Sequence, residues 1–169
     1  MDESVVSVIH RAVAEWSSPR HVLENGEVSF FRFRCSATKL EAAVELAGVE
    51  TAPTDVCEFM STYASVTLFE DVDYGQWGLV LMGKDASARA TAKWMATEKY
   101  AVVGDLVVGE FLGDGERLII RAMPHGADFG HVYVSLPIDE RAEWFHVANS
   151  FAEFVSSFVR FEGRKYWER

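Results

Sequence analysis

The first 34 residues contain one apolar pattern typical of a helix and one typical of a strand. The helical pattern repeats at steps of three and four, which places its members on one face: Val5, Val8, Ile9, Ala12 and Trp16. The run Ser17-Ser18-Pro19 ends it. Residues 27–34 then alternate apolar and polar side chains, with an interruption at Phe31, and predict a strand that carries Val28, Phe30 and Phe33.

Two further helices are predicted between residues 38 and 63. Thr38 and Glu41 form a capping-box pattern, in which each side chain satisfies a backbone N–H group at the helix start. An apolar stripe follows and stops at Gly48; its members are Leu40, Ala43, Val44 and Ala47. The second helix opens at Pro53, and its first turn carries the negative charge that the helix dipole favours, from Asp55 and Glu58. We expect the two helices to form a short hairpin, with the second helix facing inward through Val56, Phe59, Met60 and Tyr63.

The middle of the chain is rich in segments typical of strands. They cover residues 66–68, 78–82, 106–112 and 118–121. The sequence Gly113-Asp114-Gly115 separates the last two, and Asp-Gly favours the positive φ angles of a tight hairpin turn. Residues 88–98 interrupt the series with Ala, Arg, Lys and Met, which favour a short helix.

The C-terminal part predicts one more strand and a final helix. Residues 131–135 alternate as a strand does, and Trp144 and Phe145 are expected to pack inside. Ser150 and Glu153 form a second capping box before an apolar stripe made of Phe151, Phe154, Val155 and Phe158. Helices, then strands, then a helix predict an α+β fold: a central, mainly antiparallel sheet packed by N-terminal helices and a C-terminal helix. No linker divides the chain, so residues 1–169 are expected to form a single domain.

The charge balance changes the range of expected partners. The chain has 16 Lys and Arg against 26 Asp and Glu, a net charge of −10. Binding of nucleic acids or of anionic membranes depends on basic residues, so neither is expected. The start Met1-Asp2-Glu3-Ser4 lacks the basic and apolar parts of a secretory signal, which indicates a cytoplasmic protein. Cys35 and Cys57 are therefore expected to be reduced thiols.

Residues that could carry chemistry show no recognisable catalytic spacing. The five histidines lack the spacing of a metal site, the glycines at 109, 113 and 115 do not match a phosphate-binding loop, and no serine sits in a nucleophile elbow. His125, His131 and Asp128 could converge, but a turn beside a strand explains them more simply. We therefore expect no catalytic residue, no cofactor and no metal, so that the protein is not an enzyme.

Acidic residues are unevenly distributed along the chain. Residues 40–83 contain no Lys or Arg but carry Glu41, Glu45, Glu50, Asp55, Glu58, Glu70, Asp71 and Asp73. A second interval without basic residues, 100–116, carries Asp105, Glu110, Asp114 and Glu116. One interpretation is a solvated acidic surface that maintains solubility. The other is a docking surface for a basic protein, because opposite potentials speed encounter and fix the register of binding.

Two aromatic residues favour the docking interpretation. Tyr74 and Trp77 directly follow the acidic run, and buried aromatic anchors often supply binding energy while peripheral charges steer. Core packing of Trp77 is the alternative. The predicted partner-binding residues are Glu70, Asp71, Asp73, Tyr74, Trp77, Asp114 and Glu116.

Residues 40–159 resemble the SUKH superfamily, which includes the SMI/KNR-type immunity proteins of bacterial polymorphic toxin systems. The resemblance rests on the order and spacing of four segments: the helix at 40–48, the Pro53 helix ending near Tyr63, the strand and turn at 107–114, and the helix start at 150–155. Residues 1–39 form an N-terminal helix and strand extension outside it. The resemblance implies an α+β fold and a function in binding proteins.

Bacterial members of this superfamily commonly neutralise a cognate toxin, often a nuclease. The resemblance thus implies a toxin-neutralising immunity protein, and the acidic charge fits a basic toxin partner. One alternative is a non-catalytic regulatory scaffold that binds an endogenous protein, and an orphan domain of the same fold is another. A small-molecule enzyme is the least favoured reading. The sequence leaves the oligomeric state and the identity of the toxin open.

Overall fold

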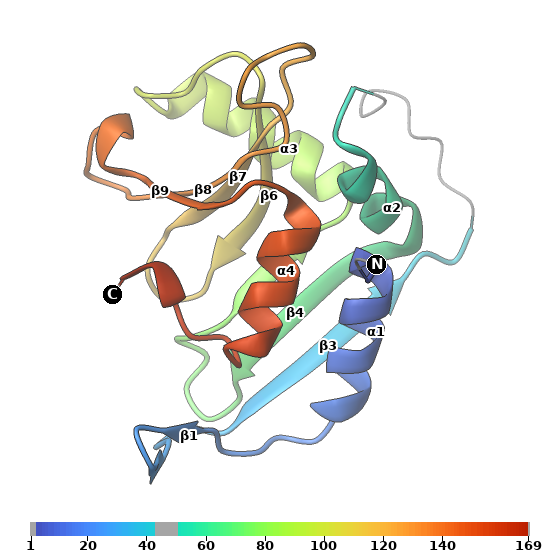
Figure 1. Cartoon of the computed structure of the whole chain (residues 1–169), viewed down its shortest axis with the longest axis vertical. Helices are drawn as coiled ribbons and strands as arrows, with labels where there is room; N and C mark the ends of the chain where they lie inside the picture. The colour runs from blue at the N-terminus through green and yellow to red at the C-terminus, as the bar shows by residue number, and fades with distance from the viewer. Residues whose placement is uncertain (1–2, 43–50, 169) are drawn as a thin grey trace.

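The main sheet has seven antiparallel strands in the order β3-β4-β5-β6-β7-β8-β9 (Figure 1). The structure is a computed structural model that describes residues 3–42 and 51–168. Each strand pairs with the next one along the chain, so the sheet is a continuous meander. The strands are β3 (Phe33–Lys39), β4 (Tyr63–Asp71), β5 (Leu79–Met82), β6 (Asp105–Phe111), β7 (Arg117–Arg121), β8 (Val132–Ser135) and β9 (Phe145–Ala148). The predicted α+β fold with an antiparallel sheet is confirmed.

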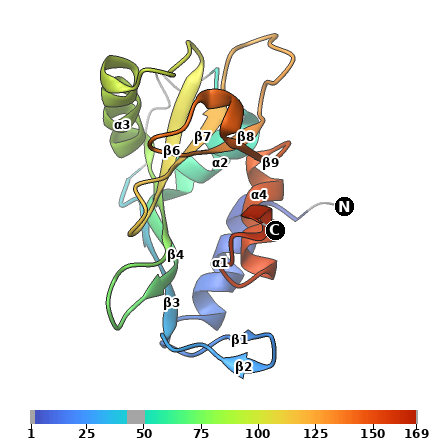
Figure 2. The ribbon, with the colours of Figure 1, turned by 90° about the vertical axis from the view of Figure 1, so that its left-hand side faces the viewer.

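Helices cover both faces of this sheet. On one face lie α1 (Val5–Glu15), α2 (Thr54–Thr62) and α4 (Phe151–Arg160), and on the other lies α3 (Lys84–Thr97) (Figure 2). Two short 3-10 helices follow later in the chain, η1 (Arg141–Glu143) and η2 (Tyr166–Glu168). A separate hairpin of β1 (Leu23–Glu24) and β2 (Glu27–Val28) projects beyond the lower end of the main sheet (Figure 1).

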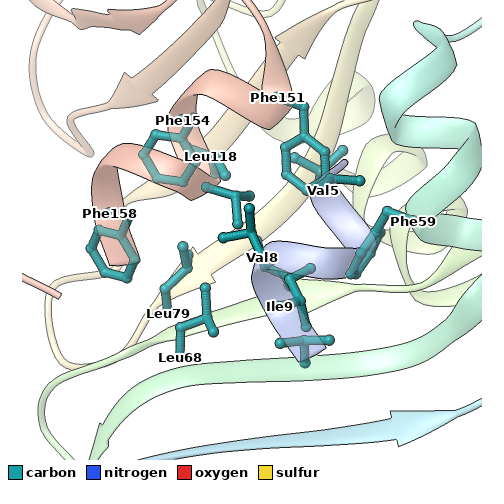
Figure 3. Packing of buried hydrophobic residues seen from close by; sticks show 14 of the residues in the cluster. Val5, Val8, Ile9, Phe59, Leu68, Leu79, Leu118, Phe151, Phe154 and Phe158 are labelled. Carbon is teal, nitrogen blue, oxygen red and sulfur yellow. The ribbon is translucent and has the colours of Figure 1, made fainter. Parts of the chain in front are cut away.

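The main core lies between the sheet and the helices α1, α2 and α4 (Figure 3). Its side chains come from all three helices and from the strands between them, and each is at most 1% exposed: Val8, Ile9, Phe59, Leu68, Leu79, Leu118, Phe151, Phe154 and Phe158. Burial of one such side chain stabilises a fold by about 1.5–3 kcal/mol. The predicted apolar stripes of α1 and α4 are therefore confirmed as core-facing.

The opposite face carries a smaller cluster under α3, where Trp94 packs against Trp144 with ring centroids 5.5 Å apart. Asp105 is buried beside it. Oδ1 accepts hydrogen bonds from Arg121 Nη1 (2.7 Å) and Arg141 Nη2 (2.8 Å), while Oδ2 accepts from Arg141 Nη1 (2.8 Å) and Trp94 Nε1 (3.1 Å). This network joins α3, the start of β6, the end of β7 and η1.

Local capping explains where α4 begins. Ser150 Oγ accepts a hydrogen bond from the Glu153 N–H at 3.1 Å, and the Glu153 carboxylate accepts one from the Asn149 N–H at 2.7 Å. The predicted capping box is confirmed, although its return bond reaches Asn149 instead of Ser150. This pairing satisfies two N–H groups that a helix start leaves without partners.

Several predicted elements are wrong. Thr38 is a strand residue of β3, opposite Ser65, and does not cap a helix. Leu40, the first member of the predicted stripe, lies in no helix, and the rest of the stripe, at residues 43–48, lies outside the described residues. Of the proposed helical hairpin, the structure therefore describes only the second helix, α2. The helix predicted from Pro53 is confirmed as α2, which ends at Thr62, and Tyr63 begins β4. The short helix predicted at residues 88–98 is confirmed as α3, which begins earlier, at Lys84. The strand β9 was not predicted, because the sequence pattern indicated only that Trp144 and Phe145 pack inside.

The predicted strand at residues 27–34 is also wrong as one element. It splits into β2 and the start of β3, with a loop between them. Ser29 explains the break: its Oγ accepts a hydrogen bond from the Val22 N–H (3.0 Å) and donates one to the Phe31 carbonyl (2.7 Å). Local side-chain bonds of this kind compete with strand pairing. Phe30 is consequently 79% exposed instead of facing the core.

Candidate functional site: the hairpin end

The predicted partner-binding residues gather at one end of the molecule, which we call the hairpin end. It consists of the β1–β2 hairpin with residues 29–34 that follow it, the end of β4 (residues 70–71), the β4–β5 loop (residues 72–78), the β6–β7 turn (residues 112–116) and the C-terminal segment (residues 163–168). Trp77 Nε1 donates a hydrogen bond to the Gly163 carbonyl at 3.3 Å, and Lys165 binds Asp114 and Glu116. Segments distant in sequence thus form one continuous surface.

Two of the predicted carboxylates are paired with arginines at or just before the start of the neighbouring strand β3. Asp73 Oδ1 lies 2.7 Å from Arg32 Nη2, and Glu70 Oε2 lies 3.3 Å from Arg34 Nη2. The side-chain hydrogen bond from Arg32 holds the pKa of Asp73 below its ordinary value. Both carboxylates remain partly exposed, but local cations compensate their charge.

Asp114 and Glu116 share one cation, Lys165. Its ammonium binds both carboxylates, at 2.7 Å for Glu116 Oε2, and lies 5.2 Å from the ring centroids of Trp77 and Phe111. Burial lowers the pKa of Lys165, but the hydrogen bonds to the two carboxylates outweigh it, so the pKa lies above its ordinary value. Glu116 is only 6% exposed and therefore acts within the molecule, holding the C-terminal segment in place.

Asp71 differs from the other four carboxylates, because it is 1% exposed and forms no ion pair among the described residues. Its Oδ1 accepts hydrogen bonds from the N–H groups of Asp73 (2.9 Å) and Tyr74 (3.0 Å), which fixes the β4–β5 turn. Its Oδ2 is buried and has no hydrogen-bond partner in the described part of the chain. A buried carboxylate oxygen without a partner is energetically unfavourable, so it marks a place where a donor can bind.

The two predicted aromatic residues occupy different environments. Tyr74 is 64% exposed, and its ring packs edge-on against Phe31 with centroids 5.3 Å apart. Trp77 is half-buried and packs against the main core. The core-packing alternative for Trp77 is thus confirmed, while its part in docking stays a prediction.

The β1–β2 hairpin carries site residues that the sequence pattern did not reveal. Leu23 and Val28 of the hairpin, and Phe30 just beyond it, are 65%, 63% and 79% exposed, which is unusual for side chains of this size so close together in sequence. The missed signal was Asn25-Gly26, whose φ angles of 53° and 81° form the tight turn that this dipeptide favours. Reading residues 27–34 as one strand hid that hairpin.

The hairpin also places two glutamates opposite each other. Glu24 and Glu27 are direct cross-strand neighbours, both exposed, and neither forms an ion pair with a described residue. Like charges directly opposite each other destabilise a strand pair. The uncompensated negative charge of the hairpin end therefore comes mainly from Glu24, Glu27 and Asp71, because Asp73 and Glu70 are each paired with an arginine and Asp114 and Glu116 share Lys165.

A hollow of about 420 Å³ lies beneath the hairpin. Its walls combine aromatic rings with a few charged groups, and the lining residues include Phe30, Phe31, Phe33, Asp71, Trp77 and Arg164. The volume is within the range of about 300–1,000 Å³ that ligand sites occupy.

The other candidate residues are engaged elsewhere. Asp128 Oδ2 binds Arg121 Nε at 2.9 Å, and His131 stacks on His146 with ring centroids 4.6 Å apart. Within residues 3–42 and 51–168, no three His, Cys, Asp or Glu side chains come together as a metal site requires.

No disulfide joins Cys35 and Cys57. In the described part of the chain, every helix is too short or too polar to cross a lipid bilayer.

No protein-family model, curated protein or solved structure matches this chain. The resemblance to the SUKH superfamily therefore stays a prediction from local motifs.

Proposed function

We propose that this protein binds a basic partner protein through the hairpin end and neutralises it, as the resemblance to toxin-binding immunity proteins implies. The observation that carries the proposal is the set of exposed apolar side chains at the hairpin end: Leu23, Val28, Phe30 and Tyr74. An exposed apolar patch rimmed by polar residues marks a protein interaction site.

Charge supports a basic partner over an acidic one. The whole chain carries a net charge of −10, and Glu24 and Glu27 face each other without a cation. A lysine or arginine of the partner would relieve that repulsion, so binding and hairpin stability would reinforce each other. Aromatic side chains of the hairpin end would supply apolar contact. Once bound, this chain would cover the toxin's active site or an adjacent surface.

The proposal assigns the chain no chemical reaction of its own. To neutralise a toxin by covering its active site, the chain needs a stable binding surface but no catalytic group. The hairpin end meets that need, because Lys165 fixes the C-terminal segment and Asp71 fixes the β4–β5 turn. A pre-formed surface loses little conformational entropy on binding.

Co-expression tests this proposal. The chain is produced together with the product of the large open reading frame beside its gene, and both growth rescue and complex formation are measured. We expect rescue accompanied by a stable complex. Rescue without a complex would contradict neutralisation by binding, and a complex with a cellular protein but no rescue would favour the scaffold alternative.

A matched pair of variants places the interface. Phe30→Ala removes an exposed ring of the hairpin end. Val103→Ala is the control: it removes an apolar side chain that is 67% exposed in the loop before β6, whereas the hairpin end adjoins the other end of β6. We expect Phe30→Ala alone to weaken rescue. Equal effects of the two variants would contradict the assignment of the interface to the hairpin end.

A further inference from the structure

The hollow beneath the hairpin combines an aromatic wall with one unsatisfied carboxylate. Phe31 and Phe33 line it together with Trp77, and Asp71 belongs to the same lining. The Asp71 Oδ1 atom is already occupied by two backbone N–H groups, which leaves Oδ2 as the acceptor without a partner. The hollow therefore offers apolar contact and negative charge at the same place.

Three cations near the hollow are paired with carboxylates. Arg32 pairs with Asp73, Arg34 with Glu70 and Lys165 with Glu116. Arg164 lines the hollow, but its Nε donates to the Phe161 carbonyl at 3.0 Å, and it forms no ion pair with Asp71. Among the described residues, Asp71 is thus the carboxylate of the hairpin end that is both buried and without a cation.

We infer that the hollow receives an arginine side chain of the partner protein, whose guanidinium donates to Asp71 Oδ2 while its methylene groups lie along the aromatic wall. The inference rests on the proposed function and names the contact that the partner makes. Arginine fits better than lysine because a guanidinium is more weakly hydrated than an ammonium and stacks on aromatic rings. A charge-assisted hydrogen bond would then satisfy the one acceptor that the fold leaves unpaired.

Entry to the hollow requires a side chain to move. Asp71 Oδ2 is out of contact with solvent, so an arriving group must displace a neighbour. Phe30 lines the hollow and is 79% exposed, which means that it has little packing to lose. Its ring contacts Phe31, with centroids 5.1 Å apart.

A small probe tests the hollow without the partner. N-acetyl-arginine methylamide is titrated into the isotopically labelled full chain, and the shift of the Trp77 indole N–H signal is followed. The control probe is the citrulline analogue, which has the same shape without the charge. We expect saturable shifts at the hairpin end with arginine and at least about tenfold weaker binding of citrulline. Equal binding of both probes, or tighter binding of the lysine analogue, would overturn the inference.

A matched pair of variants tests the role of Asp71. Asp71→Asn keeps the oxygen that holds the β4–β5 turn but removes the charge, and it should weaken the arginine probe by about tenfold. Asp73→Asn removes a nearby carboxylate that Arg32 already neutralises, and it should change binding less than about twofold. Unchanged binding in Asp71→Asn would overturn the inference.

The same variants separate this inference from the proposed function. If Phe30→Ala weakens the complex with the partner but Asp71→Asn does not, the arginine site is wrong and the proposed interface stands. If the arginine probe binds through Asp71 but no neighbouring gene product forms a complex, the site is supported and the proposed function fails.

Discussion

Asp105 is a fully buried carboxylate that two arginines hold in place. Its side chain is 0% exposed, and the ion pairs with Arg121 and Arg141 come from segments far apart in sequence. Burial raises the pKa of Asp105, but hydrogen bonds from Arg141, from the Val102 N–H and from Trp94 outweigh it, so the pKa lies below 3.8. The charged form is therefore the stabilising one.

We expect Asp105→Asn to lower the free energy of unfolding by roughly 3 kcal/mol near neutral pH, because it leaves the partly buried guanidinium of Arg141 without its counter-ion and removes one of the two carboxylates that pair with Arg121. A group whose folded pKa is lowered stabilises the fold above its unfolded value and loses that effect as the pH falls through its folded pKa. The difference between wild type and variant should therefore shrink below pH 3.8. Urea unfolding at a series of pH values measures it, and a difference that stays constant would contradict this role.

Cys35 is a buried thiol whose reactivity the fold suppresses. Burial raises the pKa of Cys35 to about 12, and Sγ accepts a hydrogen bond from the Phe69 N–H at 3.3 Å. Because the thiolate is the reactive form, we expect alkylation of the folded protein to label the half-buried Cys57 and spare Cys35. Mass spectrometry of folded and denatured samples checks this, and labelling of Cys35 in the folded protein would refute it.

At the scale of elements, the β6–β7 turn and the β4–β5 loop are fitted against each other. Gly113 has φ +90°, and a Cβ at this position would lie 2.2 Å from the Gln76 carbonyl oxygen. Gly115 also has a positive φ of +72°, but its nearest neighbour would be 3.8 Å away. A substitution at Gly115 would therefore cause backbone strain alone, whereas one at Gly113 would cause both backbone strain and a steric collision.

We expect Gly113→Ala to destabilise the protein more than Gly115→Ala does. Gly115→Ala should cost about 1–2 kcal/mol from backbone strain alone. Gly113→Ala adds a collision that pushes the β4–β5 loop away from the turn. Thermal unfolding of both variants measures the difference, and equal melting temperatures would contradict the close packing of these two connections.

Elements with a regular local pattern could be predicted from the sequence, and elements that depend on tertiary contacts could not. The stripe of α4 and the Asp114 turn follow from spacing and turn chemistry alone. By contrast, β9 is a short strand whose pairing with β8 supplies its stability, and Thr38 joined β3 because its backbone pairs with β4. Intrinsic preferences yield to such pairing.

The candidate site was predictable in place but not in detail. Tyr74 and the acidic run before it do lie at an exposed end of the sheet. The partners of the carboxylates could not be foreseen, because the Arg32–Asp73 and Arg34–Glu70 pairs depend on the register between β3 and β4. Burial of Asp71 likewise follows from the loop packing around it.

At the scale of the whole molecule, the net charge of −10 acts together with a local excess at the hairpin. We expect Glu24→Gln with Glu27→Gln to slow association with a basic partner and to reduce its salt dependence. The matched control is Glu140→Gln with Glu143→Gln, which changes the net charge equally next to and within η1, where Arg141 contacts the start of β6. Stopped-flow measurements give the association rate constants of the two double variants. Equal slowing of both would contradict a local role of the hairpin charges, because it would show that only the net charge determines the rate.

The central claim is that the hairpin end is the binding surface. The most direct test is the dissociation constant of the complex with the neighbouring toxin candidate, measured by calorimetry for wild type, Phe30→Ala with Tyr74→Ala, and Val103→Ala, after unfolding curves confirm that each variant is folded. We expect the double variant to bind at least about thirtyfold more weakly, as the loss of central aromatic anchors does, and Val103→Ala to bind like wild type. Unchanged affinity in the folded double variant would contradict the claim.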